Sequence, residues 1–315
     1  MGEEMRFFVG MHQPCDAGKV QAAFVSVNRL RKRKGRFPVN DWIMDSGAFS
    51  TILTHGGYPD PPEAYAAEIR RWAHNGNLLA AVAQDYMCEA HMLAITGKTI
   101  EEHQQLTVER YDALTACDTG GVYIMPVLQG YAPEDYVRHI EMYGDRLSRG
   151  MWVGVGSVCK RNGDPVAIEE VLLAVKRARP DLQLHGFGIK TTALQSGLVR
   201  DLLATADSMA WSFAARKQGR NANDWREAAA FRDRIETMPV QHSLLARSSP
   251  QKFPKHPRAG EGWRVLECDY SGAVERWLRI AGHKMWREYL GVASKKNAVN
   301  FANGFVSSSQ PTRGE

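Results

Sequence analysis

The sequence lacks the features of exported and membrane-spanning proteins. No apolar run in its 315 residues approaches the roughly 20 residues that cross a bilayer, and the first residues, MGEEMRFFVG, are acidic where an export signal is basic. The five cysteines are odd in number and never spaced as Cys-x-x-Cys, which argues against a disulfide framework and a cysteine-rich zinc site. These absences predict a cytoplasmic protein with reduced thiols and no membrane partner.

Charge of one sign is not in large excess either. The 40 Lys and Arg against 35 Asp and Glu give a formal net charge of +5, which is too small to establish a polyanionic partner. Basic residues do concentrate in NRLRKRKGR, residues 28–36. Such a segment can bind phosphates with counterion release, or it can be the solvated face of a helix, and the sequence leaves both interpretations open.

What the sequence does contain is a regular alternation of apolar runs and amphipathic stretches. Strands are expected over residues 7–11, 22–27, 42–45, 78–84, 122–129, 151–157, 182–188 and 208–212. Helices are expected over residues 61–76, 99–117, 132–150 and 164–180, and Thr99 with Glu102 three residues later fits a capping box. Strands that alternate with helices of this length predict parallel β/α units.

About eight such units predict an α/β fold of the (β/α)8 TIM-barrel type. A doubly wound open sheet is the alternative, although no Gly-x-Gly-x-x-Gly loop follows the first strand. Too few residues separate the first two strands for a crossover helix, so either that join is irregular or one strand is misassigned. The barrel is expected over residues 1–238, and a Pro- and Lys-rich linker with a small C-terminal accessory helical region over residues 239–315.

Polar residues and glycines stand where the predicted strands end. Carboxyl ends of barrel strands converge on one face, and barrel enzymes carry their active sites there. The residues at these ends are Asp45, Gln84, Asp85, Gln129, Gly130, Gly154, Gly156, Ser157, Lys190 and Asp207. Each alone can be a turn or capping residue, and Asp-Ser-Gly at residues 45–47 has good turn chemistry. Three carboxylates and an amide together are costly to bury unless something pairs with them, which favours a functional site.

The residue types suggest a reaction at a sugar that carries a purine. Two carboxylates can act as nucleophile and as acid/base at an anomeric carbon. A third carboxylate beside an amide and exposed glycine N–H groups suits a guanine-like ring, whose N1–H and amino group donate and whose O6 accepts. No cofactor is needed for such chemistry.

At these residues the chain resembles a known superfamily. DSGAF, VLQG, VGVG and ADSMAWSFAAR resemble, in order and context, the strand-end motifs of the tRNA-guanine transglycosylase superfamily. The longer strings HQPC, QDYMCE, PVLQGY, VGVGSVCKR and LHGFGIK are more similar to its branch of DpdA-type deazapurine DNA modification proteins, which is typical of phages. The likeness covers residues 5–238, and for a phage-encoded protein it implies the host cytoplasm.

The resemblance implies a role for each matching residue. Asp207 falls at the position of the nucleophile that attacks C1′ and expels guanine, and Asp45 at that of the general acid/base. Asp85 and Gln129 match residues that hydrogen-bond the base. The rest of the expected substrate-binding set is Ser46, Gly130, Gly154 and Gly156.

The implied reaction exchanges guanine in DNA for a 7-deazaguanine, with 7-cyano-7-deazaguanine as the expected incoming base, through a covalent glycosyl-aspartate. Flipping a base out of the stack needs a rim that holds phosphates. The expected nucleic-acid-binding residues are Arg31, Lys32, Arg33, Lys160, Arg161, Arg216 and Arg220. DNA and the free base are therefore the expected partners, a homodimer is left open, and no cofactor is expected.

The sequence departs from the superfamily at two points. A structural zinc usually follows the nucleophile strand, but residues 216–231 contain neither Cys nor His, so we expect no metal. Asp207 also lies just before the predicted strand at residues 208–212 rather than after it, so a strand over residues 202–206 is an alternative.

Other functions stay open at this point. The first is a transglycosylase that acts on tRNA, since the 2′-hydroxyl is the chief local difference between the two polymers. A barrel that binds nucleic acid without catalysis is a second, although it would not need a nucleophilic aspartate. An unrelated glycosidase with two carboxylates is a third, and it leaves Asp85 and Gln129 unexplained.

Overall fold

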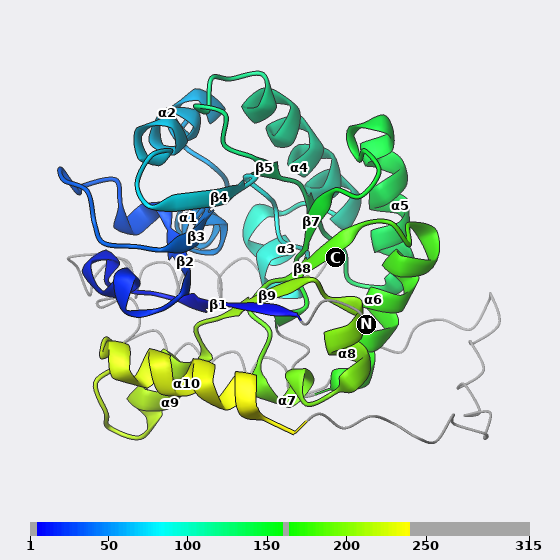
Figure 1. The fold of residues 1–315 in the computed structure, drawn as a ribbon. Helices are drawn as coiled ribbons and strands as arrows, with labels where there is room; N and C mark the ends of the chain where they lie inside the picture. The colour runs from blue at the N-terminus through cyan, green and yellow to red at the C-terminus, as the bar shows by residue number, and fades with distance from the viewer. Residues whose placement is uncertain (1–4, 160–163, 240–315) are drawn as a thin grey trace, which may run out of the picture. The chain divides into compact units, whose positions relative to one another are not determined.

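The computed structural model describes residues 5–159 and 164–239, with strands at the centre and helices around them (Figure 1). All strand pairs are parallel, and the sheet order is β5-β4-β3-β2-β1-β9-β8-β7-β6. The strands are β1 Arg6–Gly10, β2 Ala22–Ser26, β3 Asp41–Asp45, β4 Asn77–Val82, β5 Ile124–Met125, β6 Val127–Leu128, β7 Trp152–Val155, β8 Gln183–Gly186 and β9 Thr205–Ser208. The expected linker and accessory region falls almost wholly outside the described residues.

One predicted strand is divided in two by a proline. β5 pairs with β4, and β6 pairs with β7, although only Pro126 separates β5 from β6. Proline has no N–H to give to a ladder, so the run changes partners at this residue. The two pieces occupy one position in the ring, and the predicted eight-position TIM-type barrel is confirmed.

Helices follow most strands and cover the outside of the barrel. They are α1 Ala48–His55, α2 Pro62–Trp72, α3 Ala90–Thr96, α4 Ile100–Thr115, α5 Pro133–Tyr143, α6 Pro165–Ala178, α7 Thr191–Leu194, α8 Gly197–Leu202, α9 Ala210–Lys217 and α10 Trp225–Thr237. The predicted capping box begins α4, because Glu102 N–H donates to Thr99 and Thr99 N–H donates to the Glu102 carboxylate. Within the described part of the chain, no helix is long and apolar enough to cross a bilayer.

The first connections of the barrel contain no full helix. The 3-10 helix η1, Pro14–Lys19, joins β1 to β2, which confirms the irregular join. The short 3-10 helix η2, Val27–Arg29, follows β2, and the basic segment then continues as a loop rather than as a helix face. A third 3-10 helix, η3 Gly144–Arg146, ends the α5 region.

The strand predicted over residues 208–212 is wrong. β9 ends at Ser208, and α9 begins at Ala210. The apolar run there is the buried face of a helix: Trp211 and Ala215, four residues apart, are both buried. The Trp211 indole N–H donates to Gly10 O at 2.9 Å and so ties α9 to β1. Asp207 therefore lies inside the last strand of the barrel rather than before it.

Aromatic side chains gather around one buried histidine between the strands of the barrel. His185 on β8 stacks on Phe24 of β2, with ring centroids 5.7 Å apart. Phe8, Trp152 and Phe187 also contact the imidazole, with centroids 4.7 to 6.3 Å away. These rings form an apolar layer next to Asp207, because His185 also contacts that carboxylate.

Candidate active site

The predicted acidic residues and the predicted amide meet at one end of the barrel. Asp45 is the last residue of β3, Asp85 follows β4, Gln129 directly follows β6, and Asp207 is in β9. The Gln129 amide donates to Asp85. The charge of Asp207 raises the pKa of Asp45, and the charge of Asp45 raises the pKa of Asp85. Parallel strands bring their carboxyl ends together, so these distant positions form one site.

Backbone and ring atoms hold the Asp207 carboxylate. Its Oδ1 accepts from Gly188 N–H at 3.0 Å and lies 3.4 Å from His185 Nε2. Its backbone O accepts from Ile189 N–H at 2.9 Å, so the loop after β8 wraps this residue. Among residues 5–159 and 164–239, no group hydrogen-bonds Oδ2. One oxygen is thus fixed, while the other keeps its lone pairs for a ligand.

Asp45 is a carboxyl group that holds its proton more tightly than usual. Burial raises its pKa to about 6, and the negative charge of Asp207 adds to this effect. Hydrogen bonds from Ser26 and from Gly47 N–H oppose the shift. Although part of its surface is exposed, the group lies deep among protein atoms at the end of β3. A carboxyl group with a pKa near 6 can both give and take a proton at neutral pH.

Asp85 and Gln129 form a polar pair. The Gln129 Nε2 donates to Asp85 Oδ2 in a short hydrogen bond, and both side chains are buried. Burial raises the pKa of Asp85 to about 7. The hydrogen bond from Gln129 lowers this pKa, whereas the charges of Asp45 and Glu89 raise it further. The second hydrogen of Nε2 is available to a bound ligand.

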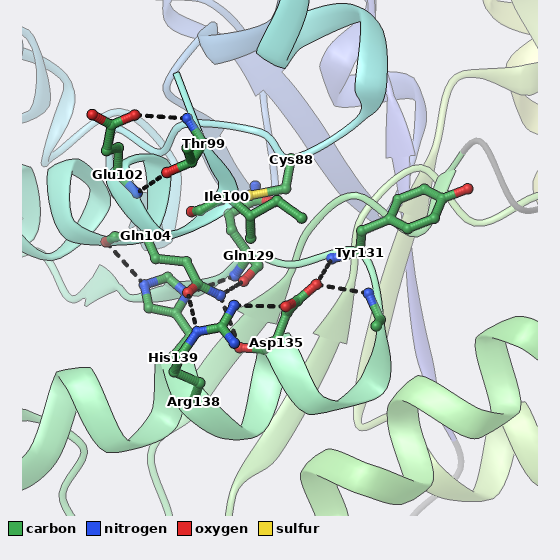
Figure 2. A network of polar contacts seen from close by, with 11 residues as sticks. Cys88, Thr99, Ile100, Glu102, Gln104, Gln129, Tyr131, Asp135, Arg138 and His139 are labelled. Carbon is green, nitrogen blue, oxygen red and sulfur yellow. Dashed lines mark hydrogen bonds and ion pairs between the residues drawn. The ribbon is translucent and has the colours of Figure 1, made fainter. Parts of the chain in front are cut away.

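A rigid polar network holds the Gln129 backbone (Figure 2). Gln129 N–H donates to His139 Nδ1 at 2.8 Å, and Gln104 Nε2 donates to Gln129 O at 2.7 Å. His139 Nε2 lies 3.1 Å from Gln104 O, so the ring donates there and is neutral. Burial lowers the pKa of His139 to about 3, which agrees with this assignment.

Asp135 fixes the loop that follows Gln129. Its carboxylate accepts from Tyr131 N–H at 2.9 Å, Ala132 N–H at 2.8 Å and Arg138 at 2.6 Å (Figure 2). Burial alone would raise the pKa of Asp135, but these hydrogen bonds lower it below the usual value. The amide that contacts Asp85 thus projects from a backbone that is held on both sides.

The glycines predicted to contact the base have packing roles in this structure. A side chain at Gly156 would lie 2.6 Å from Gln129 Cδ, and one at Gly154 would strike the Phe187 ring. A side chain at Gly130 would lie 2.7 Å from Asp135 Cβ. Gly156 therefore makes room for the Gln129 amide, which is a role that the sequence alone did not indicate.

Among the predicted residues that the structure describes, Ser46 is the one with a buried polar atom that has no hydrogen bond. Its Oγ is buried and makes no hydrogen bond to any residue in the described ranges. The Ser46 hydroxyl lies near Tyr58 and opposes the rise in the pKa of that phenol, but the Tyr58 OH itself donates to Asp85 O at 3.0 Å. A buried hydroxyl without a partner next to Asp45 is well placed to bind a polar ligand.

The predicted phosphate-binding residues fall into different settings. Arg31 lies 3.5 Å from Asp60, and Arg33 donates to Gly35 O at 3.0 Å, so both help to hold their loop. Lys32 is exposed. Arg216 is half-buried on α9, and Arg220 pairs with Glu227. Lys160 and Arg161 lie outside the described residues.

Sequence reasoning missed two residues of this site, His185 beside Asp207 and Glu89 near Gln129. It named Ser157 among the residues at strand ends but gave it no role, and in the structure Ser157 lies between Glu89 and Gln129. Ser157 has φ +54°, and it is the one residue other than glycine with positive φ in the described ranges. The motif LHGFG contains His185 and QDYMCE contains Glu89, but nothing in their spacing shows which partners they reach.

No cluster suited to a metal ion occurs in residues 5–159 and 164–239, where no three His, Cys, Asp or Glu side chains gather closely enough. Cys15, Cys88, Cys117 and Cys159 form no disulfide bond, and Cys88 is buried. The absence of zinc stays a prediction for the whole chain.

The fold defines the class of the protein as a parallel β/α barrel, and three aspartates and an amide lie together at the carboxyl ends of its strands. The family model of DeoxyPurine in DNA protein A, DpdA, matches residues 3–224. The chain therefore belongs to the DpdA family. Membership implies a transglycosylase-type enzyme of deazapurine modification that acts on DNA. No curated protein sequence matches the chain.

Proposed function

We propose that the protein exchanges guanine in DNA for a 7-deazaguanine through a covalent glycosyl-aspartate on Asp207. The observation that carries this proposal is the setting of Asp207, whose Oδ1 is held by Gly188 N–H and His185 while Oδ2 is available. A carboxylate that is fixed through one oxygen is positioned to attack a sugar carbon with the other. DpdA membership supports DNA as the polymer.

Each step of the reaction has a group in the site. Asp207 Oδ2 attacks C1′, and the electrons of the C1′–N9 bond go to the departing guanine, which takes a proton from Asp45. The incoming 7-deazaguanine then gives its N9 proton to Asp45, and its N9 attacks C1′. The Asp207 carboxylate leaves as the new glycosidic bond forms. Asp45 suits both transfers because burial raises its pKa to about 6.

Asp85 and Gln129 are the groups that bind the base in this proposal. An ionised Asp85 accepts from N1–H and from the amino group of a guanine-like ring, and Gln129 Nε2 donates to O6. Ser46 Oγ, which is buried without a partner among the described residues, offers a further contact. 7-Cyano-7-deazaguanine keeps these groups of guanine and is our proposed incoming base.

Incubation with labelled guanine and an oligonucleotide tests the exchange. We expect label to enter guanine-containing DNA and unlabelled 7-cyano-7-deazaguanine to displace it, with no incorporation by Asp207→Asn. A matched RNA of the same sequence distinguishes the polymers, because label in RNA alone would make the protein a tRNA-type enzyme. Release of free guanine without incorporation would indicate a glycosidase. Binding without either product would indicate a non-catalytic barrel.

A further inference from the structure

Ser157 lies between the Asp85–Gln129 pair and a buried carboxyl group, Glu89. Its Oγ is 2.7 Å from Gln129 Oε1 and 2.9 Å from Glu89 Oε2. It also accepts from Cys88 N–H at 2.8 Å. A serine hydroxyl has one hydrogen and cannot donate fully to two acceptors at once. These groups form a chain of hydrogen bonds from Asp85 through Gln129 and Ser157 to Glu89. Since Gln129 Nε2 donates to Asp85, one more proton is needed to give every contact in this chain a hydrogen.

Two arrangements satisfy every group in the chain. In the first, protonated Glu89 donates to Ser157, Ser157 donates to Gln129 Oε1, and Gln129 Nε2 donates to ionised Asp85. In the second, the amide is turned by half a revolution: protonated Asp85 donates to Oε1, Nε2 donates to Ser157, and Ser157 donates to ionised Glu89. Each arrangement has one proton on the two carboxyl groups together, and they differ by its transfer from Glu89 to Asp85.

We propose that Asp85 and Glu89 share one proton through Gln129 and Ser157, and that its position sets the hydrogen-bonding pattern shown to a base. The first arrangement presents an acceptor at Asp85 and a donor at Gln129, which matches N1–H and O6 of guanine. In the second, the one hydrogen of the Asp85 carboxyl group is already donated to Gln129 Oε1, and the turned amide shows an acceptor where Nε2 stood, so O6 of the base finds no donor and the base is rejected. Glu89 is thus a positioning residue for base selection. This role rests on the proposed function, whereas the shared proton does not.

The surroundings of the chain support a single shared proton. Glu89 is buried, with Oε2 near Ser157 and Oε1 3.6 Å from Cys159 Sγ. Two carboxylates buried this close repel each other, so ionising both is costly. Burial raises the pKa of Asp85 to about 7, and the charge of Glu89 contributes. Gly156 lets the Gln129 amide lie at this point of the chain of hydrogen bonds, since a side chain there would lie 2.6 Å from Cδ.

Several other titratable groups act on the pair. On the Asp85 side they are Asp45, Tyr58, Tyr65 and Tyr143, and on the Glu89 side they are Cys88, His103 and Cys159. The tyrosines and Cys88 are neutral at pH 7, because burial raises their pKa values. Burial also lowers the pKa of His103, which keeps that ring neutral. Asp45 is then the other group near Asp85 that changes charge near neutral pH.

Infrared spectra of the ligand-free full chain at pH 7.5 test the shared proton, because a protonated carboxyl group absorbs apart from a carboxylate. We expect wild type to show a protonated-carboxyl absorption that both Glu89→Gln and Asp85→Asn lose. An amide N–H in place of Glu89 donates to Ser157 permanently and leaves Asp85 ionised. An amide in place of Asp85 donates to Gln129 Oε1 and leaves Glu89 ionised. Glu109→Gln, at an exposed position on α4, is the matched control and should leave the spectrum unchanged.

Retention of the absorption in either variant would overturn the proposal, because one carboxyl group alone would then hold the proton. Its absence from wild type would overturn it too. Both substitutions keep the size of the side chain, and near-ultraviolet circular dichroism checks that the variants are folded.

The affinity for 7-cyano-7-deazaguanine at pH 7.5, measured by calorimetry, tests the role in base selection. Wild type divides between the two arrangements, and only the first matches the base, so its affinity is reduced by the fraction in the second. Glu89→Gln holds the first arrangement and should bind the base more tightly, by about twofold if the two arrangements are equally populated. An affinity equal to or below that of wild type would overturn this role. If neither protein binds the base, the proposed function fails, while the infrared result still decides the shared proton.

Discussion

Asp207 and Asp85 are both buried carboxyl groups at the barrel mouth, but different groups surround them. Asp207 receives Gly188 N–H and lies beside His185, whose ring is enclosed by aromatic side chains. Asp85 instead contacts the end of a side-chain amide, which leads on to a serine hydroxyl and Glu89. Fixed backbone and ring atoms suit an oxygen that must meet one carbon, whereas rotatable groups suit a pocket that releases one base and accepts another.

Removing the Asp207 carboxylate should abolish the exchange reaction without affecting the residues that bind the base. Asp207→Asn is expected to lower exchange by ~10⁴-fold or more, because an amide is too poor a nucleophile to open the glycosidic bond. Binding of the free base should survive, since Asp85 and Gln129 remain. Label incorporation measures the first effect, and calorimetry with 7-cyano-7-deazaguanine measures the second. Exchange within tenfold of wild type would remove Asp207 from the chemistry.

Asp45 stands between the two sides, and its substitution tests whether it moves protons. Asp45→Asn should slow exchange by about 10²- to 10³-fold, as for a lost general acid/base, and leave DNA binding largely intact. The pH profile of wild-type exchange should show a break near pH 6, where Asp45 titrates, and the variant should lack it. If these residues form only a turn, the variant will keep full activity, since Asn serves turns about as well as Asp.

The raised pKa values on the base side predict how stability depends on pH. Folded Asp45 and Asp85 keep their protons up to about pH 6 and 7, whereas in the unfolded chain they lose them near 3.8. The folded state therefore binds more protons between these values, and stability falls as pH rises through this window. Asp85→Asn should relieve a penalty on the order of 3 kcal/mol at pH 8 and little at pH 4.

Thermal unfolding of Asp85→Asn and wild type at the two pH values measures this effect. Asp181→Asn is a control of opposite sign, because the Arg179 guanidinium lowers the pKa of Asp181 and its loss should destabilise the protein at pH 8. Equal pH dependence in Asp85→Asn and wild type would show that Asp85 has an ordinary pKa.

A smaller effect is expected at the rim, outside both halves of the site. Lys32, Lys34 and Arg36 are the exposed basic residues of the loop after β2. Their joint substitution by Ala should weaken DNA binding for all sequences alike and reduce the salt slope by up to about 0.9 for each phosphate that the loop no longer neutralises. Fluorescence anisotropy against salt concentration measures both quantities.

The matched control for the rim is Arg149→Ala with Arg177→Ala, because these exposed residues lie where β7 begins and α6 ends, at the opposite end of the barrel. Affinity and salt slope should not change in the control. The same result in the loop variant would show that this loop does not bind phosphates.

The smallest effect concerns metal. We expect elemental analysis to find no stoichiometric zinc in the full chain. Chelators should leave both folding and base exchange unchanged. One zinc per chain would contradict this prediction and place the metal on residues that the sequence analysis did not identify.

Local signals explain how much of this molecule could be predicted. Thr99 and Glu102 fix a helix start from sequence alone, and strand ends locate Asp45, Asp85 and Gln129 because parallel strands share one carboxyl end. Asp207 was located by the family resemblance instead, because the strand that contains it was predicted in the wrong place. The error at residues 208–212 arose because a short buried helix face and a buried strand are both apolar runs.

The contacts of Ser157 and Glu89 could not be predicted in the same way. They depend on how the loops after β4, β6 and β7 meet in space, and neither spacing nor periodicity encodes that arrangement. The same holds for Gly156, whose role follows from the approach of the Gln129 amide.

The proline between β5 and β6 has a consequence for how the barrel opens. At Pro126 the ladder changes partners, and the hydroxyl of Tyr143 there accepts from Val127 N–H at 3.3 Å and donates to Val127 O at 3.1 Å. A side chain from α5 thus replaces a neighbouring strand at this point. The hydrogen bonding around the ring of strands is thus interrupted at this point. Local opening of the barrel, measured as amide hydrogen exchange, should therefore start beside the Gln129 loop rather than around the whole circumference.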